Sequence, residues 1–117
     1  MINRERYDIV VYRRDTWDGL IITISKNGNP IDLTGCAITM QVKVNPTDTS
    51  SVLTLSTVNN EITITEPTNG KFRINATVIN LDSGTYYYDI QFNFSPTLIK
   101  TYMFGTFDVT QDITVLN

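Results

Sequence analysis

An alternating run in the C-terminal half of the chain, from Tyr86 to Phe94, constrains the fold more than any other feature. Every second residue of this run is aromatic or aliphatic, and the residues between are mostly polar. Successive side chains of a β-strand point to opposite faces, so the run predicts a strand with one buried face. Tyr87 and Asp89 belong to the other, outward face.

Shorter runs of the same kind recur along the chain, with turn signals roughly every 8 to 12 residues. The turn signals include Asn27-Gly28, which suits a tight hairpin. This pattern predicts an all-β, immunoglobulin-like antiparallel β-sandwich of about eight or nine short strands, with residues 1–117 forming one domain. The strands are expected at 7–12, 20–25, 37–44, 52–57, 61–65, 71–78, 86–94 and 100–109, with short further segments at 31–33 and 113–115.

Some strands are also assigned an inward face. Val44 is expected to be the last inward residue of 37–44, and Ala76 and Val78 are expected to face inward from 71–78. The facing of 100–109 stays open, because two of its aromatic residues oppose two other large apolar residues. Those pairs are Tyr102 and Phe104 against Met103 and Phe107.

The residues just before the alternating run resemble the corner of immunoglobulin-like sandwiches. In that corner a tyrosine opening a strand donates a hydrogen bond to backbone a few residues upstream. Tyr86 stands in the tyrosine's place, with Asp82 and Gly84 shaping the turn. We therefore expect these three residues to form a structural corner.

Composition and charge exclude several function classes. The net charge of −3 argues against a nucleic-acid partner, which favours a basic surface. No apolar run reaches the roughly 18 residues of a membrane span, and the first residues lack the apolar core of a signal peptide. We therefore expect synthesis in a cytoplasm and no membrane partner. Cys36 is the only cysteine and is expected to be a buried, reduced structural thiol.

No constellation of residues predicts catalysis. The chain has no histidine, which removes the Ser-His and Cys-His nucleophile pairs and the commonest metal ligand. Two carboxylate pairs, Asp15 with Asp18 and Asp108 with Asp112, are interpreted as solvated acids rather than calcium sites. No catalytic residue, cofactor or metal is predicted.

Trp17, Arg13 and Arg14 form the candidate interface. Tryptophan and arginine dominate binding hot spots, so Trp17 could anchor a protein contact. Two other interpretations stay open: its ring could stack on a sugar, or it could cap an open end of the sandwich.

A series of short motifs resembles a known family. In chain order they are Arg14-Asp15-Thr16, the segment Gly28 to Gly35, Ile38 to Lys43, Pro67 to Phe72, Gly84 to Ile90, and Gly105 to Thr110. Their order and spacing are similar to the immunoglobulin-like N-terminal domain of bacteriophage baseplate upper proteins and related phage tail or head accessory proteins.

The resemblance implies a non-enzymatic virion structural protein that is made in the host cytoplasm. It would be an assembly or decoration module of a tail, baseplate or capsid, and its partners would be other virion proteins or further copies of itself. The terminal strands 7–12 and 113–115 are the expected contact edges. The alternative hypothesis is a carbohydrate-binding or host-surface adhesion module that binds glycan through Trp17 and exposed tyrosines.

Overall fold

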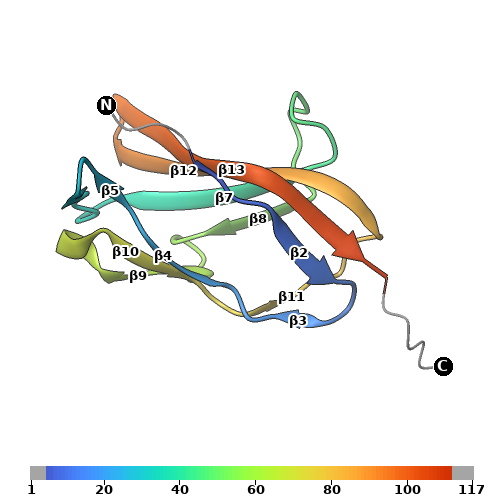
Figure 1. Cartoon of the computed structure of the whole chain (residues 1–117). Coiled ribbons are helices and arrows are strands. Elements are labelled where there is room, and N and C mark those ends of the chain that lie inside the picture. The colour runs from blue at the N-terminus through green and yellow to red at the C-terminus, as the bar shows by residue number, and fades with distance from the viewer. Residues whose placement is uncertain (1–4, 112–117) are drawn as a thin grey trace.

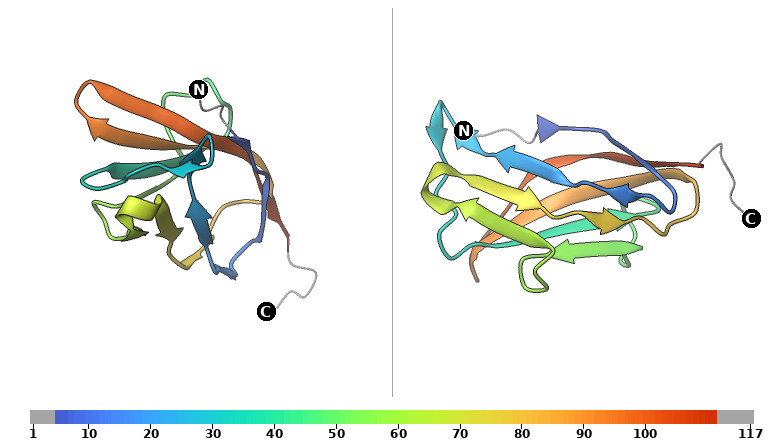
Figure 2. Two further views of the ribbon diagram at one scale, coloured as in Figure 1. Left: turned by 60° about the vertical axis from the view of Figure 1, so that its left-hand side comes forward. Right: turned by 90° about the horizontal axis from the view of Figure 1, so that it is seen from below.

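The computed structural model describes residues 5–111, which form two layers of β-strands (Figures 1 and 2). The larger layer is a six-stranded sheet in the order β1-β13-β12-β7-β8, with β2 also paired to β13. Its strands are β1 (Glu5–Arg6), β2 (Ile9–Tyr12), β7 (Ala37–Lys43), β8 (Leu53–Ser56), β12 (Gly84–Ser95) and β13 (Leu98–Thr110).

The second layer is built from shorter pieces. A three-stranded sheet has the order β4-β10-β9, and two two-stranded ribbons pair β11 with β3 and β5 with β6. The strands are β3 (Thr16–Trp17), β4 (Leu20–Thr23), β5 (Ser25–Lys26), β6 (Asn29–Pro30), β9 (Ile62–Glu66), β10 (Lys71–Ile74) and β11 (Thr77–Val78), and a short helix, η1 (Pro67–Asn69), joins β9 to β10. No helix among residues 5–111 is long and apolar enough to cross a membrane.

The core lies between the two layers. Phe72 of β10 and Phe92 of β12 are both fully buried and meet edge to face, with ring centroids 5.5 Å apart. They are surrounded by aliphatic residues from both layers, among them Leu33, Ile38, Met40, Leu55, Ile74, Ile79 and Ile90. The all-β sandwich predicted from the alternating runs is confirmed, and Tyr88, Ile90 and Phe92 lie on the buried face of β12 as expected.

The hairpin of β12 and β13 is the longest element and contains a β-bulge. Ile90 pairs with Met103, whereas the next residue, Gln91, pairs with Thr101, so Tyr102 is an extra residue. An extra residue shifts the alternation of a strand by one position. This shift explains why residues 100–109 show no single apolar face in the sequence.

The number of strands and the direction of the first ones differ from expectation. The described residues form 13 strand segments, because several expected strands are divided into shorter ones and five segments have only two residues. β1 and β2 lie parallel to β13, whereas the rest of the large sheet is antiparallel. No hairpin joins β2 to β13, so the local turn signals of the sequence do not set the direction of this pairing.

Three inward assignments were wrong. Val44 lies beyond the end of β7 and is exposed, because the chain turns at Asn45, whose N–H donates to Asp48 Oδ2 at 3.1 Å. Ala76 and Val78 are also exposed. The strand expected at 71–78 breaks after Ile74 and its alternation changes, so that Ile79 is buried instead.

One turn predicted from the sequence is found in the structure. Asn27 and Gly28 have φ values of 52° and 80° and join β5 to β6, as a tight hairpin requires. The expected strand at 113–115 and the residue Asp112 lie outside the described residues.

Candidate functional site

The corner before β12 ties two segments together through Asp82. The Tyr86 hydroxyl donates a hydrogen bond to the Asp82 carbonyl oxygen at 2.7 Å. The Arg13 guanidinium donates to the Asp82 carboxylate, with Nη2 3.2 Å from Oδ1. Gly84 opens β12 with a φ of 153°, a conformation that residues with a Cβ rarely adopt. We call Arg13, Trp17, Asp82 and Tyr86 the corner cluster.

Trp17 lies in a short strand of the second layer. As part of β3 it pairs with Thr77 of β11, and its ring packs edge to face on the buried Phe107 with centroids 5.6 Å apart. This packing favours the interpretation in which Trp17 caps the sandwich, because its partly buried side chain already packs against the core.

Arg14 differs from its two neighbours in the candidate interface. Its side chain is exposed, its φ is 69°, and its N–H donates to the Ile79 carbonyl at 2.7 Å. Thus Arg13 and Trp17 contact their own fold, and Arg14 faces solvent. A role for all three in binding stays a prediction.

The N-terminal segment runs along the edge of the large sheet and exposes apolar side chains. Tyr7, Val10 and Tyr12 are 49%, 59% and 52% exposed. Val10 and Tyr12 are the outward residues of β2, whose inward residues Ile9 and Val11 are buried. We call Tyr7 to Tyr12 the N-terminal edge.

A close backbone contact holds this edge on β13. A Cβ added at Gly105 would lie 2.2 Å from the Tyr7 carbonyl oxygen, so only glycine permits the approach. The Tyr88 hydroxyl donates to the same oxygen. The Thr106 N–H donates to Asp8 Oδ1 at 3.0 Å, and this hydrogen bond is the main cause that lowers the pKa of Asp8.

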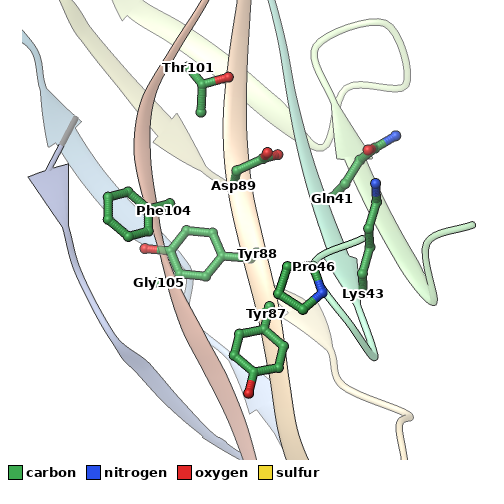
Figure 3. A pocket seen from close by; sticks show the side chains of 9 residues that line it. All are labelled: Gln41, Lys43, Pro46, Tyr87, Tyr88, Asp89, Thr101, Phe104 and Gly105. Atoms are coloured by element: carbon green, nitrogen blue, oxygen red, sulfur yellow. The ribbon is translucent and has the colours of Figure 1, made fainter. Parts of the chain in front are cut away.

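A hollow of about 210 Å³ lies on the outer face of the large sheet, over β7, β12 and β13 (Figure 3). Two exposed rings and four polar side chains line it: Tyr87, Phe104, Gln41, Lys43, Asp89 and Thr101. We call these six residues the outer hollow.

The sequence contained only part of the signal for the outer hollow. The alternation of two strands placed Gln41, Lys43, Tyr87 and Asp89 outward. The sequence did not predict that Asp89 pairs with Phe104 across the β12–β13 hairpin, because this pairing depends on the bulge at Tyr102.

Cys36 is buried, and burial raises the pKa of its thiol to about 11. A thiol with so high a pKa carries little of the reactive thiolate at neutral pH. Among the residues that the structure describes, no three His, Cys, Asp or Glu side chains are grouped so as to hold a metal ion.

Comparison with protein-family models gives a match. The family model for the BppU N-terminal domain matches residues 8–94, which include most of both layers from β2 to the buried part of β12. No curated protein matches the chain.

Proposed function

The chain belongs to the BppU N-terminal domain family, a family of phage baseplate structural proteins, and we propose that it is a non-enzymatic assembly module. In this proposal it docks on other virion proteins through its N-terminal edge. Membership implies a place in the virion and contact with other virion proteins. The proposal adds which surface docks and how it does so.

The observation that carries this proposal is the exposure of Val10 and Tyr12 on an edge strand. Among residues 5–111, β2 pairs with β13 on one side only, so part of its backbone N–H and C=O groups points away from the described part of the sheet. An edge of this kind can pair with a strand of another chain, and exposed apolar side chains beside it add buried area.

The opposite edge of the large sheet is less suited to such pairing. At the end of β8 the Ser56 N–H donates to Glu61 Oε1 at 3.1 Å, and the Glu61 N–H donates to the Ser56 carbonyl at 3.0 Å. The turn after β8 therefore covers backbone groups that a partner strand would need. The asymmetry between the two edges favours the N-terminal edge as the docking surface.

A double variant, Val10→Lys with Tyr12→Lys, tests the proposal. Both side chains are exposed, so the fold should persist while two desolvated charges oppose docking. The expected result is a folded protein that no longer incorporates into particles or copurifies with other virion proteins. Sedimentation of the purified protein reports whether self-association is lost as well.

The matched control is Ile21→Lys with Val58→Lys, which changes two exposed aliphatic residues away from the N-terminal edge. This control should incorporate normally. Equal incorporation of both double variants would exclude the N-terminal edge as the docking surface. Trp17→Ala is a poor test of docking, because the loss of its contact with Phe107 also disturbs the core.

A further inference from the structure

We propose that the outer hollow binds one pyranose ring of a carbohydrate, which stacks on Tyr87 and Phe104 and forms hydrogen bonds with Asp89, Gln41 and Lys43. This inference goes beyond the assembly role, because the outer hollow lies on the face of the sheet and the proposed docking surface is its edge. It also places the carbohydrate-binding hypothesis away from Trp17.

Two of the residues that line the outer hollow, Tyr87 and Phe104, provide apolar ring surface. Tyr87 and Phe104 are 39% and 36% exposed, on adjacent strands of the sheet. Figure 3 shows their rings on the β12 and β13 side, with the polar ends of Gln41 and Lys43 on the β7 side. A pyranose has one face of C–H groups, which suits exposed aromatic rings, and a rim of hydroxyls, which needs polar partners.

The polar side chains of the outer hollow are free to bind a ligand. Among residues 5–111, no side-chain hydrogen bond or ion pair engages Gln41, Lys43, Asp89 or Thr101. Lys43 offers donors, Asp89 offers acceptors, and Gln41 and Thr101 offer both. Sugar hydroxyls both donate and accept, so this mixed set matches them.

Other ligand classes fit the outer hollow less well. An added peptide strand needs free backbone groups, but β12 is paired on both sides, with β7 and with β13. A phosphate or nucleic acid needs an excess of positive charge, but here the one cation, Lys43, is balanced by Asp89. Sites for drug-sized molecules measure about 300–1,000 Å³, so a hollow of about 210 Å³ suits one ring.

The test is an NMR titration of the whole protein, labelled with ¹⁵N, with the methyl glycosides of glucose, galactose, N-acetylglucosamine and rhamnose. A single ring should bind with a dissociation constant in the millimolar range, as small ligands do. The expected result is saturable shifts of the Asp89 and Gly105 amide signals with at least one glycoside. A longer oligosaccharide of that sugar is then titrated. If the natural ligand is a ring within a glycan, the oligosaccharide should bind at least as tightly as the single ring; if it is a free sugar, only the single ring should bind.

Variants separate specific binding from general effects. Tyr87→Ala and Phe104→Ala should each weaken binding by about tenfold, the effect of one aromatic contact, and Asp89→Asn should also weaken it. The matched control is Tyr12→Ala, which removes another half-exposed tyrosine from the same sheet. It should bind like the wild type.

Three outcomes would overturn the proposal: no saturable shift with any of the four glycosides, an unchanged dissociation constant in Tyr87→Ala, or an equal weakening of binding in Tyr12→Ala. These results are independent of docking. If Tyr87→Ala instead abolishes incorporation into particles and no glycoside binds, the outer hollow holds a side chain of a virion protein and the sugar proposal is wrong.

Discussion

The corner cluster and the outer hollow use similar residue types for opposite purposes. Both contain aromatic rings beside charged groups, and both include residues of β12. In the corner cluster the polar groups bind one another, as in the contacts of Tyr86 and Arg13 with Asp82. In the outer hollow the corresponding groups, such as Lys43 and Asp89, have no side-chain partner among the described residues.

This difference separates residues that hold the fold from residues available to a ligand. A polar group that is satisfied within its own chain gains little from a new partner, because it must first lose the old one. Residue type alone does not make this distinction. From the sequence, Trp17 and Arg13 were candidate interface residues, but in the structure both contact other residues of their own chain.

The largest predicted difference is in the free energy of unfolding, between variants of two aromatic residues, Trp17 and Tyr87. Trp17→Ala should lower the free energy of unfolding by about 2–3 kcal/mol, somewhat less than for a fully buried aromatic residue, because the contact with Phe107 is lost. Tyr87→Ala should cost less than about 1 kcal/mol, the range of a cross-strand surface pair. Urea denaturation of both variants measures the difference, and equal losses would remove the distinction between the two sites.

Within the corner cluster, Tyr86→Phe tests the hydrogen bond to Asp82. The change removes one hydroxyl, so the free energy of unfolding should fall by about 0.5–1.5 kcal/mol while the fold is kept. Tyr12→Phe is the matched control, because the Tyr12 hydroxyl has no such partner among residues 5–111. A Tyr86→Phe melt that coincides with the wild type would show that the hydrogen bond contributes nothing to stability.

The smallest effect is expected at Asp8, which belongs to the N-terminal edge and accepts a hydrogen bond from β13. The hydrogen bond from the Thr106 N–H lowers the pKa of Asp8 in the folded protein. Its contribution to stability is therefore present above the unfolded pKa of about 3.9 and is lost as the pH falls through the lower, folded value.

Asp8→Asn removes this titration. We expect the variant to be slightly less stable than the wild type at pH 7, and the gap to close as the pH falls below about 4. Thermal melts at several pH values measure it, with Asp15→Asn as control because the Asp15 side chain makes no hydrogen bond among the described residues. A gap that is unchanged at low pH would mean that the charge of Asp8 does not stabilise the fold.

The parts of the fold that the sequence predicted depend on local chemistry. The alternation from Tyr86 to Phe94 identified β12 and its buried face, because the side-chain period of a strand is a property of the strand itself. The Asn27-Gly28 hairpin followed from the positive φ values that these residues tolerate. The expectation for Tyr86 rested in the same way on a short motif, and its partner Asp82 lies only four residues upstream.

The outer hollow and the N-terminal edge were decided by the tertiary structure. Phe104 is paired with Asp89 because the bulge at Tyr102 sets the register of β13, and the N-terminal edge approaches β13 closely because Gly105 leaves room for the Tyr7 carbonyl. These contacts join residues that are far apart in the chain. The alternation of side chains along each strand follows from the local sequence. The neighbours of a strand depend on packing and on backbone hydrogen bonds between distant segments, so no local sequence pattern predicts them.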